Sequence, residues 1–307
     1  MSRTPRGHTG PVETDPQPGA AGRTPEELRA LLSGTGYLLD QGTATALYLA
    51  LTLGKPLLIE GEPGVGKTSL AKSLASALST PLIRLQCYEG LTVSESLYEW
   101  NYQRQLLAIR LAESRHERLD DADLVTEEFL QARPVLRALR HPGPEPAVLL
   151  IDEIDRADDE FEALLLEVLG EASVTVPELG TFTATVQPIV ILTSNRSREL
   201  HDALRRRCLY HWIEFPDAVR AAEIVRSRVP GASRSLITST SEFIGRARTL
   251  ELDKPPGMAE VIDWVSALAA LGVSELSDGR VADAVSALAK SPDDRTALLE
   301  ALASASA

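Results

Sequence analysis

The chain has 307 residues, of which 44% are hydrophobic and 24% charged, and its formal net charge at pH 7 is −13. These values are typical of a soluble globular protein that is long enough for a large α/β domain and a smaller partner domain. The acidic balance argues against nucleic acid as the main partner, because phosphate backbones attract basic surfaces, and no apolar run reaches the length of a membrane span.

Residues 1–23 are rich in Pro, Gly, Thr and Arg and have almost no large apolar side chains. Such a segment cannot bury enough surface to offset its ordering entropy, so we predict a disordered tail. It has no apolar segment of the kind found in a secretory signal, and we expect a cytoplasmic protein. The two cysteines, Cys87 and Cys208, lie far apart without metal-type spacing, which predicts reduced thiols that behave as small buried side chains.

Two helices are predicted before the first strand. Thr24, Pro25 and Glu27 supply an N-cap, a first-turn proline and a capping-box glutamate. A second helical pattern covers residues 41–53, and the sequence Gly-Lys-Pro at 54–56 ends it. The chain then enters an apolar run that is typical of a buried strand.

A glycine-rich loop follows this strand and precedes an amphipathic helical pattern. Residues 61–68 match Gly-x-x-x-x-Gly-Lys-[Ser/Thr], a loop whose backbone N–H groups point at phosphate oxygens. We expect Lys67 to contact the β- and γ-phosphates and the Thr68 hydroxyl to bind Mg²⁺. The alternative is a chance glycine turn, which the flanking strand and helix disfavour. The predicted nucleotide-binding residues are Gly61, Glu62, Pro63, Gly64, Val65, Gly66, Lys67, Thr68 and Ser69.

The residues between this helix and a second apolar strand are less informative. Residues 81–87 alternate like a strand, 88–100 form a loop, and charged helical patterns cover 102–119 and 126–139. A proline- and glycine-rich turn at 141–146 follows.

A continuous apolar run at 147–151 is typical of a central parallel strand that is buried on both faces. Asp152 and Glu153 follow it, at the edge where doubly wound folds bind ligands. We predict that Asp152 holds Mg²⁺ and that Glu153 orients or deprotonates the water that attacks the γ-phosphate. The alternative, a solvated acidic helix start, fits the later carboxylates at 158–160 better.

A helix over 161–169, a hairpin over 173–184 and a third buried strand over 188–192 are predicted next. Asn195 lies just beyond this strand and could hydrogen-bond the γ-phosphate or the attacking water. Asparagine is also common in the turns that follow strands, so its position alone is a weak indication of a role in catalysis.

Three consecutive arginines, Arg205, Arg206 and Arg207, precede a short strand at 209–215. They are either a solvated basic turn or a source of positive charge for the phosphate of another subunit. From residue 216 onward the pattern is helical, with predicted helices at 217–228, 236–248, 258–271 and 279–303.

With these segments in order, the chain resembles the AAA+ ATPases and, within them, the MoxR family. The segments that carry the resemblance are 61–68 (Walker A), 149–153 (Walker B), Asn195 (sensor 1), the helix and hairpin at 159–184, 203–208 (arginine-finger box) and 254–264 (lid). The resemblance implies an α/β fold, a P-loop NTPase parallel sheet flanked by helices over 24–215, followed by a small all-α lid domain over 216–307.

The segments 87–90 and 98–103 resemble a subgroup encoded beside molybdenum-containing carbon monoxide dehydrogenases, which assists assembly of their active-site cluster. The family resemblance implies a homo-oligomeric ring, expected to be a hexamer, with ATP between subunits. It also implies an adaptor protein with a von Willebrand factor A domain and a client metalloenzyme. It places the trans-acting arginine at Arg207, with Arg206 as the alternative. Many AAA+ lids carry a second-sensor arginine, which is missing here, and Lys254 is the nearest basic residue.

The sequence therefore predicts an ATP-hydrolysing chaperone that uses Mg²⁺ and remodels or activates a client metalloenzyme. Two alternatives stay open. The chain could bind ATP as a sensor without hydrolysing it, or it could be a nucleic-acid-linked remodelling ATPase, which the acidic composition disfavours.

Overall fold

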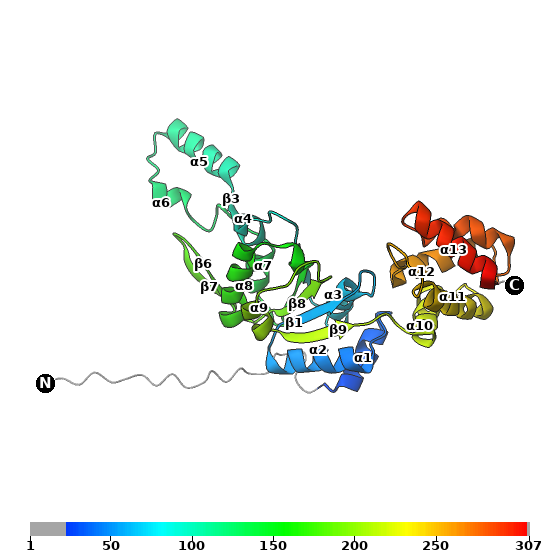
Figure 1. Cartoon of the computed structure of the whole chain (residues 1–307). Helices are drawn as coiled ribbons and strands as arrows, with labels where there is room; N and C mark the ends of the chain where they lie inside the picture. Colours follow the sequence, from blue (N-terminus) through cyan, green and yellow to red (C-terminus); the bar gives the residue numbers. More distant parts are fainter. Residues whose placement is uncertain (1–22, 306–307) are drawn as a thin grey trace.

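The structure is a computed structural model that describes residues 23–305 (Figure 1). The tail predicted at 1–23 lies outside the described residues except for Arg23. None of the helices within 23–305 is long and apolar enough to cross a membrane.

A five-stranded parallel sheet forms the centre of the α/β part, with the strand order β2-β5-β8-β1-β9. Every residue of the three central strands, β5, β8 and β1, is buried. This confirms the prediction from their apolar runs, because strands covered on both faces need no polar face. The strands are β1 (Leu57–Gly61), β2 (Leu82–Gln86), β5 (Val148–Asp152), β8 (Ile189–Ser194) and β9 (Leu209–Ile213).

Helices cover both faces of this sheet (Figure 1). Because strand side chains alternate between faces, Leu57 and Ile59 of β1 join one hydrophobic cluster and Leu58 joins the other. The first cluster includes α1 (Pro25–Ser33), α2 (Gln41–Leu53) and α3 (Lys67–Ala77). The second includes α7 (Pro134–Leu139), α8 (Asp159–Glu171) and α9 (Asp202–Arg207).

The predicted helix start at Thr24 is confirmed in atomic detail. The Thr24 hydroxyl accepts a hydrogen bond from the Glu27 N–H at 3.2 Å, and the Glu27 carboxylate accepts one from the Thr24 N–H at 2.6 Å. The second predicted helix, α2, ends at Gly54, whose φ of +60° is in the left-handed region that favours glycine.

An arm of two helices interrupts the core between β2 and β5 and projects away from it (Figure 1). It consists of α5 (Tyr102–Arg115) and α6 (Asp121–Leu124), held by an antiparallel ribbon of β3 (Tyr98–Trp100) and β4 (Leu130–Ala132). The preceding segment, predicted as a loop, also contains the short helix α4 (Val93–Ser96). The helix predicted at 102–119 is present, but a continuous helix over 126–139 is wrong. Pro134 forces the residue before it into an extended conformation, so α7 begins only there.

The hairpin predicted at 173–184 is present as β6 (Ser173–Val176) and β7 (Gly180–Thr183). It projects from the same side of the core as α8, which precedes it (Figure 1).

Five helical segments after β9 pack around a hydrophobic core of their own, with Trp264 and Phe243 as its largest buried side chains. They are α10 (Ala218–Arg228), α11 (Arg234–Ala247), α12 (Met258–Ala270), the 3-10 helix η2 (Gly279–Ala287) and α13 (Pro292–Ala305). The single helix predicted at 279–303 is therefore wrong. The Ser291 hydroxyl accepts a hydrogen bond from the Asp294 N–H at 3.0 Å and starts a new helix at Pro292.

Candidate functional site

The glycine-rich loop between β1 and α3 has the conformation that its glycines permit. Gly64 and Gly66 have φ angles of +82° and +101°, in the region where a side chain would be strained. A Cβ on Gly61 would lie 2.4 Å from the Ile213 carbonyl oxygen of β9. The loop therefore leads into α3 at Lys67 with its N-terminal N–H groups uncapped by any side chain, which is a favourable arrangement for an anion.

Lys67 is buried, and each of its three ammonium N–H donors has an acceptor within the protein. Nζ lies 2.6 Å from the Gly61 carbonyl oxygen, 3.0 Å from that of Glu62 and 2.7 Å from Oδ1 of Asn195. Burial lowers the pKa of Lys67, and the surrounding carboxylates, Asp155 foremost, oppose that shift. The structure thus brings together the loop lysine and the asparagine at the end of β8.

Asp152, at the end of β5, is 2% exposed and accepts hydrogen bonds from two hydroxyl groups. The Thr68 hydroxyl donates to its Oδ1 at 3.0 Å, and the Thr193 hydroxyl donates to the same oxygen at 2.6 Å. Arg84 of β2 donates to Oδ2 from Nε at 2.9 Å and from Nη2 at 2.6 Å. A threonine hydroxyl beside a carboxylate is a set of hard oxygen donors, so these residues fit Mg²⁺.

Glu153 follows directly, with a φ of +57° that is uncommon for a residue with a side chain. Its N–H donates to the Thr193 hydroxyl at 2.9 Å, which fixes this backbone turn before the 3-10 helix η1 (Ile154–Arg156). Its carboxylate lies 3.0 Å from Nε of Arg156 and is partly exposed. The side chain is therefore accessible at the edge of the sheet next to Asp152.

Asp155 is a functional candidate that sequence reasoning missed. It is 3% exposed and accepts hydrogen bonds from the N–H groups of Asn195, at 3.2 Å, and Ser197, at 2.8 Å. Burial raises the pKa of Asp155, but the hydrogen bonds from Ser197 and Asn195 outweigh it and the pKa is lowered. Asp155 thus anchors the loop that carries Asn195. A carboxylate at the first turn after the acidic pair, beside apolar Ile154, is the signal that could have identified it.

A pocket of about 860 Å³ lies between the α/β part and the helical unit and includes the glycine-rich loop. This volume is within the usual range for small-molecule sites. Of the predicted loop residues, 63–69 line it, whereas Gly61 and Glu62 contribute only the carbonyl groups that hold Lys67. The other predicted residues that line it are Asp152, Glu153 and Asn195.

The pocket has an apolar part that sequence reasoning missed. Tyr37, Ile224, Met258 and Ile262 line it, the first from the segment between α1 and α2 and the others from the helical unit. The Tyr37 hydroxyl donates to the Gly66 carbonyl oxygen at 3.3 Å, and burial raises the pKa of Tyr37. The apolar and aromatic side chains that line this part suit an aromatic base.

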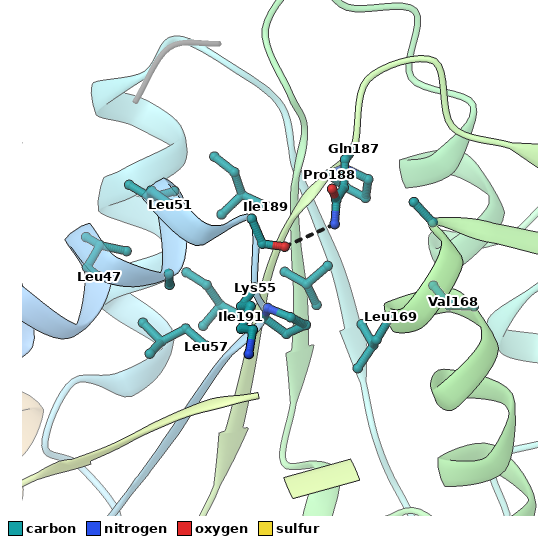
Figure 2. Close-up of a pocket in the computed structure, with 15 residues that line it drawn as sticks. Leu47, Leu51, Lys55, Leu57, Val168, Leu169, Gln187, Pro188, Ile189 and Ile191 are labelled. Atoms are coloured by element: carbon teal, nitrogen blue, oxygen red, sulfur yellow. Dashed lines mark hydrogen bonds between the residues drawn. The ribbon is translucent and has the colours of Figure 1, made fainter. Parts of the chain in front are cut away.

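Figure 2 shows a second and far smaller pocket, of about 10 Å³, between α2, α8 and the start of β8. Leucines and isoleucines line it, and the Gln187 side chain donates to the Gly54 carbonyl oxygen at 3.2 Å beside it. A space of this size holds at most about one water molecule. It is part of the core and not a ligand site.

The three consecutive arginines lie on α9 and its end, and none of them lines the large pocket. The Arg205 guanidinium lies 5.9 Å from the centre of the Tyr210 ring, and Arg207 Nη1 donates to the Ala203 carbonyl oxygen at 3.2 Å. The Arg206 side chain is exposed and has no hydrogen bond or ion pair within residues 23–305. The structure therefore does not bring these arginines to the loop of their own chain.

Lys254 is also outside the pocket. Its backbone N–H donates to the Asp294 carboxylate at 3.3 Å, and its side chain is exposed. No residue of α12 that lines the pocket is basic; these residues are Met258, Ala259, Ile262 and Asp263.

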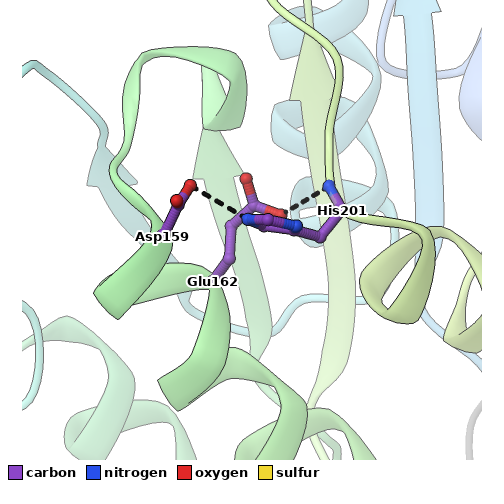
Figure 3. Close-up of side chains that lie close together, drawn as sticks. All are labelled: Asp159, Glu162 and His201. Atoms are coloured by element: carbon purple, nitrogen blue, oxygen red, sulfur yellow. Dashed lines mark hydrogen bonds and ion pairs between the residues drawn. The ribbon is translucent and has the colours of Figure 1, made fainter.

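Asp159 and Glu162 of α8 and His201, just before α9, form a cluster of possible metal ligands (Figure 3). Glu162 is 1% exposed, forms an ion pair with Arg198 and accepts a hydrogen bond from the His201 N–H at 3.0 Å. His201 Nε2 lies 2.9 Å from Asp159 Oδ1. Because Arg198 already compensates the buried charge, the cluster is a polar network that fastens the segment before α9 to α8.

Comparison with known proteins supports the nucleotide site. A sequence model of the AAA domain (dynein-related subfamily) matches residues 56–208. The gas vesicle ATPase GvpN1 of Halobacterium salinarum is 27% identical over 65% of this chain and 57% of its own length. Protein NorQ of Paracoccus denitrificans is 23% identical over 70% of this chain and 73% of its own. Protein MoxR of Paracoccus denitrificans is 28% identical over 46% of this chain and 34% of its own. The chain therefore spans little more than half the length of the first of these relatives and a third of the last.

Proposed function

Because this chain belongs to the MoxR family of AAA+ ATPases, we propose that it hydrolyses ATP and uses the energy to remodel or activate a client protein. One observation carries the proposal. Lys67 at the start of α3, Asp152 at the end of β5 and Asn195 just after β8 line one pocket of about 860 Å³, and Lys67 donates a hydrogen bond to Asn195. Convergent polar groups in a pocket of this size are the usual mark of an active site.

The phosphate end of the nucleotide is assigned to the glycine-rich loop. The backbone N–H groups at the start of α3 and the ammonium of Lys67 bind the β- and γ-phosphates. Thr68 and Asp152 would hold Mg²⁺, which when bound neutralises charge on the phosphates. Tyr37 and the apolar residues beyond it receive the base.

Hydrolysis is assigned to the residues at the edge of the sheet. Glu153 takes the proton of the water that attacks the γ-phosphate, because it is the accessible carboxylate next to the metal-binding Asp152. Asn195 orients that water or the γ-phosphate, and Asp155 acts as a positioning residue by holding the Asn195 backbone.

The remaining positive charge comes from a neighbouring subunit. Arg207 stabilises the charge that develops on the γ-phosphate, with Arg206 as the alternative. The position of all three arginines outside their own pocket supports a role between subunits. The chain would then assemble into a ring, which we propose is hexameric, and catalysis would depend on assembly.

Motion between two units would transmit the energy. We propose a core over 24–215 and a lid over 216–307, whose separate hydrophobic cores support independent movement. The hairpin β6–β7 and the segment 88–100 face the client in this proposal. The client is a molybdenum-containing carbon monoxide dehydrogenase whose active-site cluster is being assembled, reached through an adaptor with a von Willebrand factor A domain.

The decisive experiment measures ATP turnover and ATP binding by the assembled protein. Glu153→Gln should bind ATP and abolish hydrolysis, and Arg207→Ala should do the same only in the ring. Normal turnover by Arg207→Ala in the ring would instead assign the role of the trans-acting arginine to Arg206. A wild-type protein that binds ATP but never hydrolyses it, even with its adaptor, would favour a nucleotide sensor. Stimulation by nucleic acid would favour the nucleic-acid-linked alternative.

A further inference from the structure

Arg220 lines the large pocket from the first turn of α10, the helix that enters the helical unit. Its backbone position is fixed, because Asp217 caps the helix and accepts the Arg220 N–H at 2.8 Å. Arg220 belongs to no sequence motif, and none of the roles proposed above uses it.

The Arg220 guanidinium is only half satisfied. Nη1 donates to the Glu223 carboxylate at 3.0 Å, whereas Nη2 is completely buried and has no hydrogen-bond acceptor within residues 23–305. A buried charged donor without an acceptor is costly, and native proteins rarely retain one without a reason. The pair with Glu223 is not that reason, because Glu223 is 48% exposed and such i, i+3 surface pairs contribute little.

The surroundings of Arg220 connect it to the phosphate loop. Its charge lies close enough to Tyr37 to oppose the effect of burial, which raises the pKa of that phenol. The Tyr37 hydroxyl in turn donates to the Gly66 carbonyl oxygen at 3.3 Å. Arg220, Tyr37 and Gly66 all line the same pocket.

Few other cations of the helical unit reach the pocket. The pocket-lining residues of α12 are apolar or acidic, and Lys254 lies outside. Arg228, at the end of α10, lines the pocket but is exposed to solvent. Arg220 is thus the lining arginine of this unit that combines a fixed position with a buried, unpaired donor.

We propose that Arg220 binds the nucleotide from the helical unit, with Nη2 donating to a phosphate oxygen. A guanidinium suits this acceptor because its planar donors match phosphate geometry and it stays charged at every relevant pH. The inference rests on the nucleotide binding proposed above and adds the residue by which the helical unit detects the nucleotide. ATP held by the glycine-rich loop and by Arg220 would link the two units.

The test compares two arginines of the same helix in the full-length protein. Fluorescent ATP and ADP analogues are titrated into the wild type, Arg220→Met and the control Arg226→Met, whose side chain is exposed and does not line the pocket. Loss of one charge-assisted hydrogen bond should weaken nucleotide binding about tenfold in Arg220→Met only. The nucleotide affinity of Arg220→Lys should fall between those of the wild type and Arg220→Met, because lysine keeps the positive charge but lacks the planar pair of guanidinium donors. A loss for both nucleotides assigns a phosphate that ATP and ADP share, and a loss for ATP alone assigns the γ-phosphate.

Two further measurements separate contact from structure. Without nucleotide, Arg220→Met should melt at least as high as Arg226→Met, because it removes a buried donor that has no acceptor, and Glu223→Gln should bind nucleotide like the wild type. Wild-type affinity in Arg220→Met, or an equal loss in Glu223→Gln, would overturn the inference while leaving the proposed function intact. A wild-type protein that binds neither nucleotide would overturn the proposed function itself.

Discussion

Gly257 is the position where a single methyl group should separate the helical unit from the phosphate loop. It precedes α12 and packs directly on Gly64, and the Met258 N–H donates to the Gly64 carbonyl oxygen at 2.8 Å. A Cβ on Gly257 would lie 2.6 Å from the Gly64 Cα. The Gly257 backbone, with φ −79° and ψ 174°, is one that alanine adopts readily, so Gly257→Ala adds a steric conflict without backbone strain.

The size of the effect follows from this distance. Nonbonded carbon atoms prefer a separation of about 3.5–4.0 Å, so the two segments must move apart by about 1 Å. The Met258–Gly64 hydrogen bond, now 2.8 Å, would then exceed the length at which such bonds contribute. Its loss costs about 1 kcal/mol, and any overpacking that remains adds about 1–3 kcal/mol. If nucleotide binding requires this contact, affinity should fall at least about fivefold.

Calorimetric titration of ATP and ADP into wild type and Gly257→Ala measures this directly. Gly245→Ala is the matched control, because nothing lies within 4 Å of the added Cβ on α11. There alanine should stabilise the helix by about 0.5–1 kcal/mol and leave affinity unchanged. Equal nucleotide affinity in Gly257→Ala and wild type would refute the reasoning, since it would mean that contact between Gly64 and Gly257 is irrelevant to the bound state.

Three further changes test individual contacts of the site. Arg84→Gln removes a positive charge from Asp152, so Mn²⁺ should bind more tightly in electron paramagnetic resonance titrations, and weaker binding would contradict this. Asp155→Asn should lower the rate of hydrolysis more than it lowers nucleotide affinity, because it loosens the loop of Asn195; a change confined to affinity would count against it. Burial lowers the pKa of His211 from its ordinary 6.5, so the unfolded chain binds more protons than the folded one as the pH falls below about 7. Urea unfolding should therefore show stability lost between pH 7 and 5 in the wild type, and a smaller loss in His211→Gln.

The sheet was predictable from the sequence because its central strands are buried on both faces. The short apolar runs at 57–59, 147–151 and 188–192 are too short for a typical buried helix and fit central strands. The helices at 126–139 and 279–303 were predicted wrongly, because helical periodicity continues across a break. Pro134 and Pro292 mark those breaks, and each begins a new helix.

The residues of local motifs were predictable, and those that join the motifs were not. Lys67, Thr68 and Asp152 each lie in a short pattern with a chemical meaning. Arg84 contacts Asp152 across 68 positions of the chain because β2 and β5 are neighbours in the sheet, a pairing that the sequence does not reveal. The same holds for Arg220, whose place on the pocket depends on how the helical unit packs against the loop.

The contacts of Lys67 imply that phosphate binding is coupled to the segment that carries the arginines. Its three N–H donors each have a protein acceptor, so a phosphate oxygen must replace one of them. Two of these acceptors are carbonyl groups of the glycine-rich loop itself, and Asn195 is the one that can move without disturbing it. The segment that begins at Asn195 donates backbone hydrogen bonds to Asp155 and Glu162 and then leads into α9. A phosphate that displaces Asn195 from Lys67 therefore acts on the same segment that leads to Arg206 and Arg207. Asp155→Asn, which loosens this segment at its anchor, should weaken that coupling before it weakens binding.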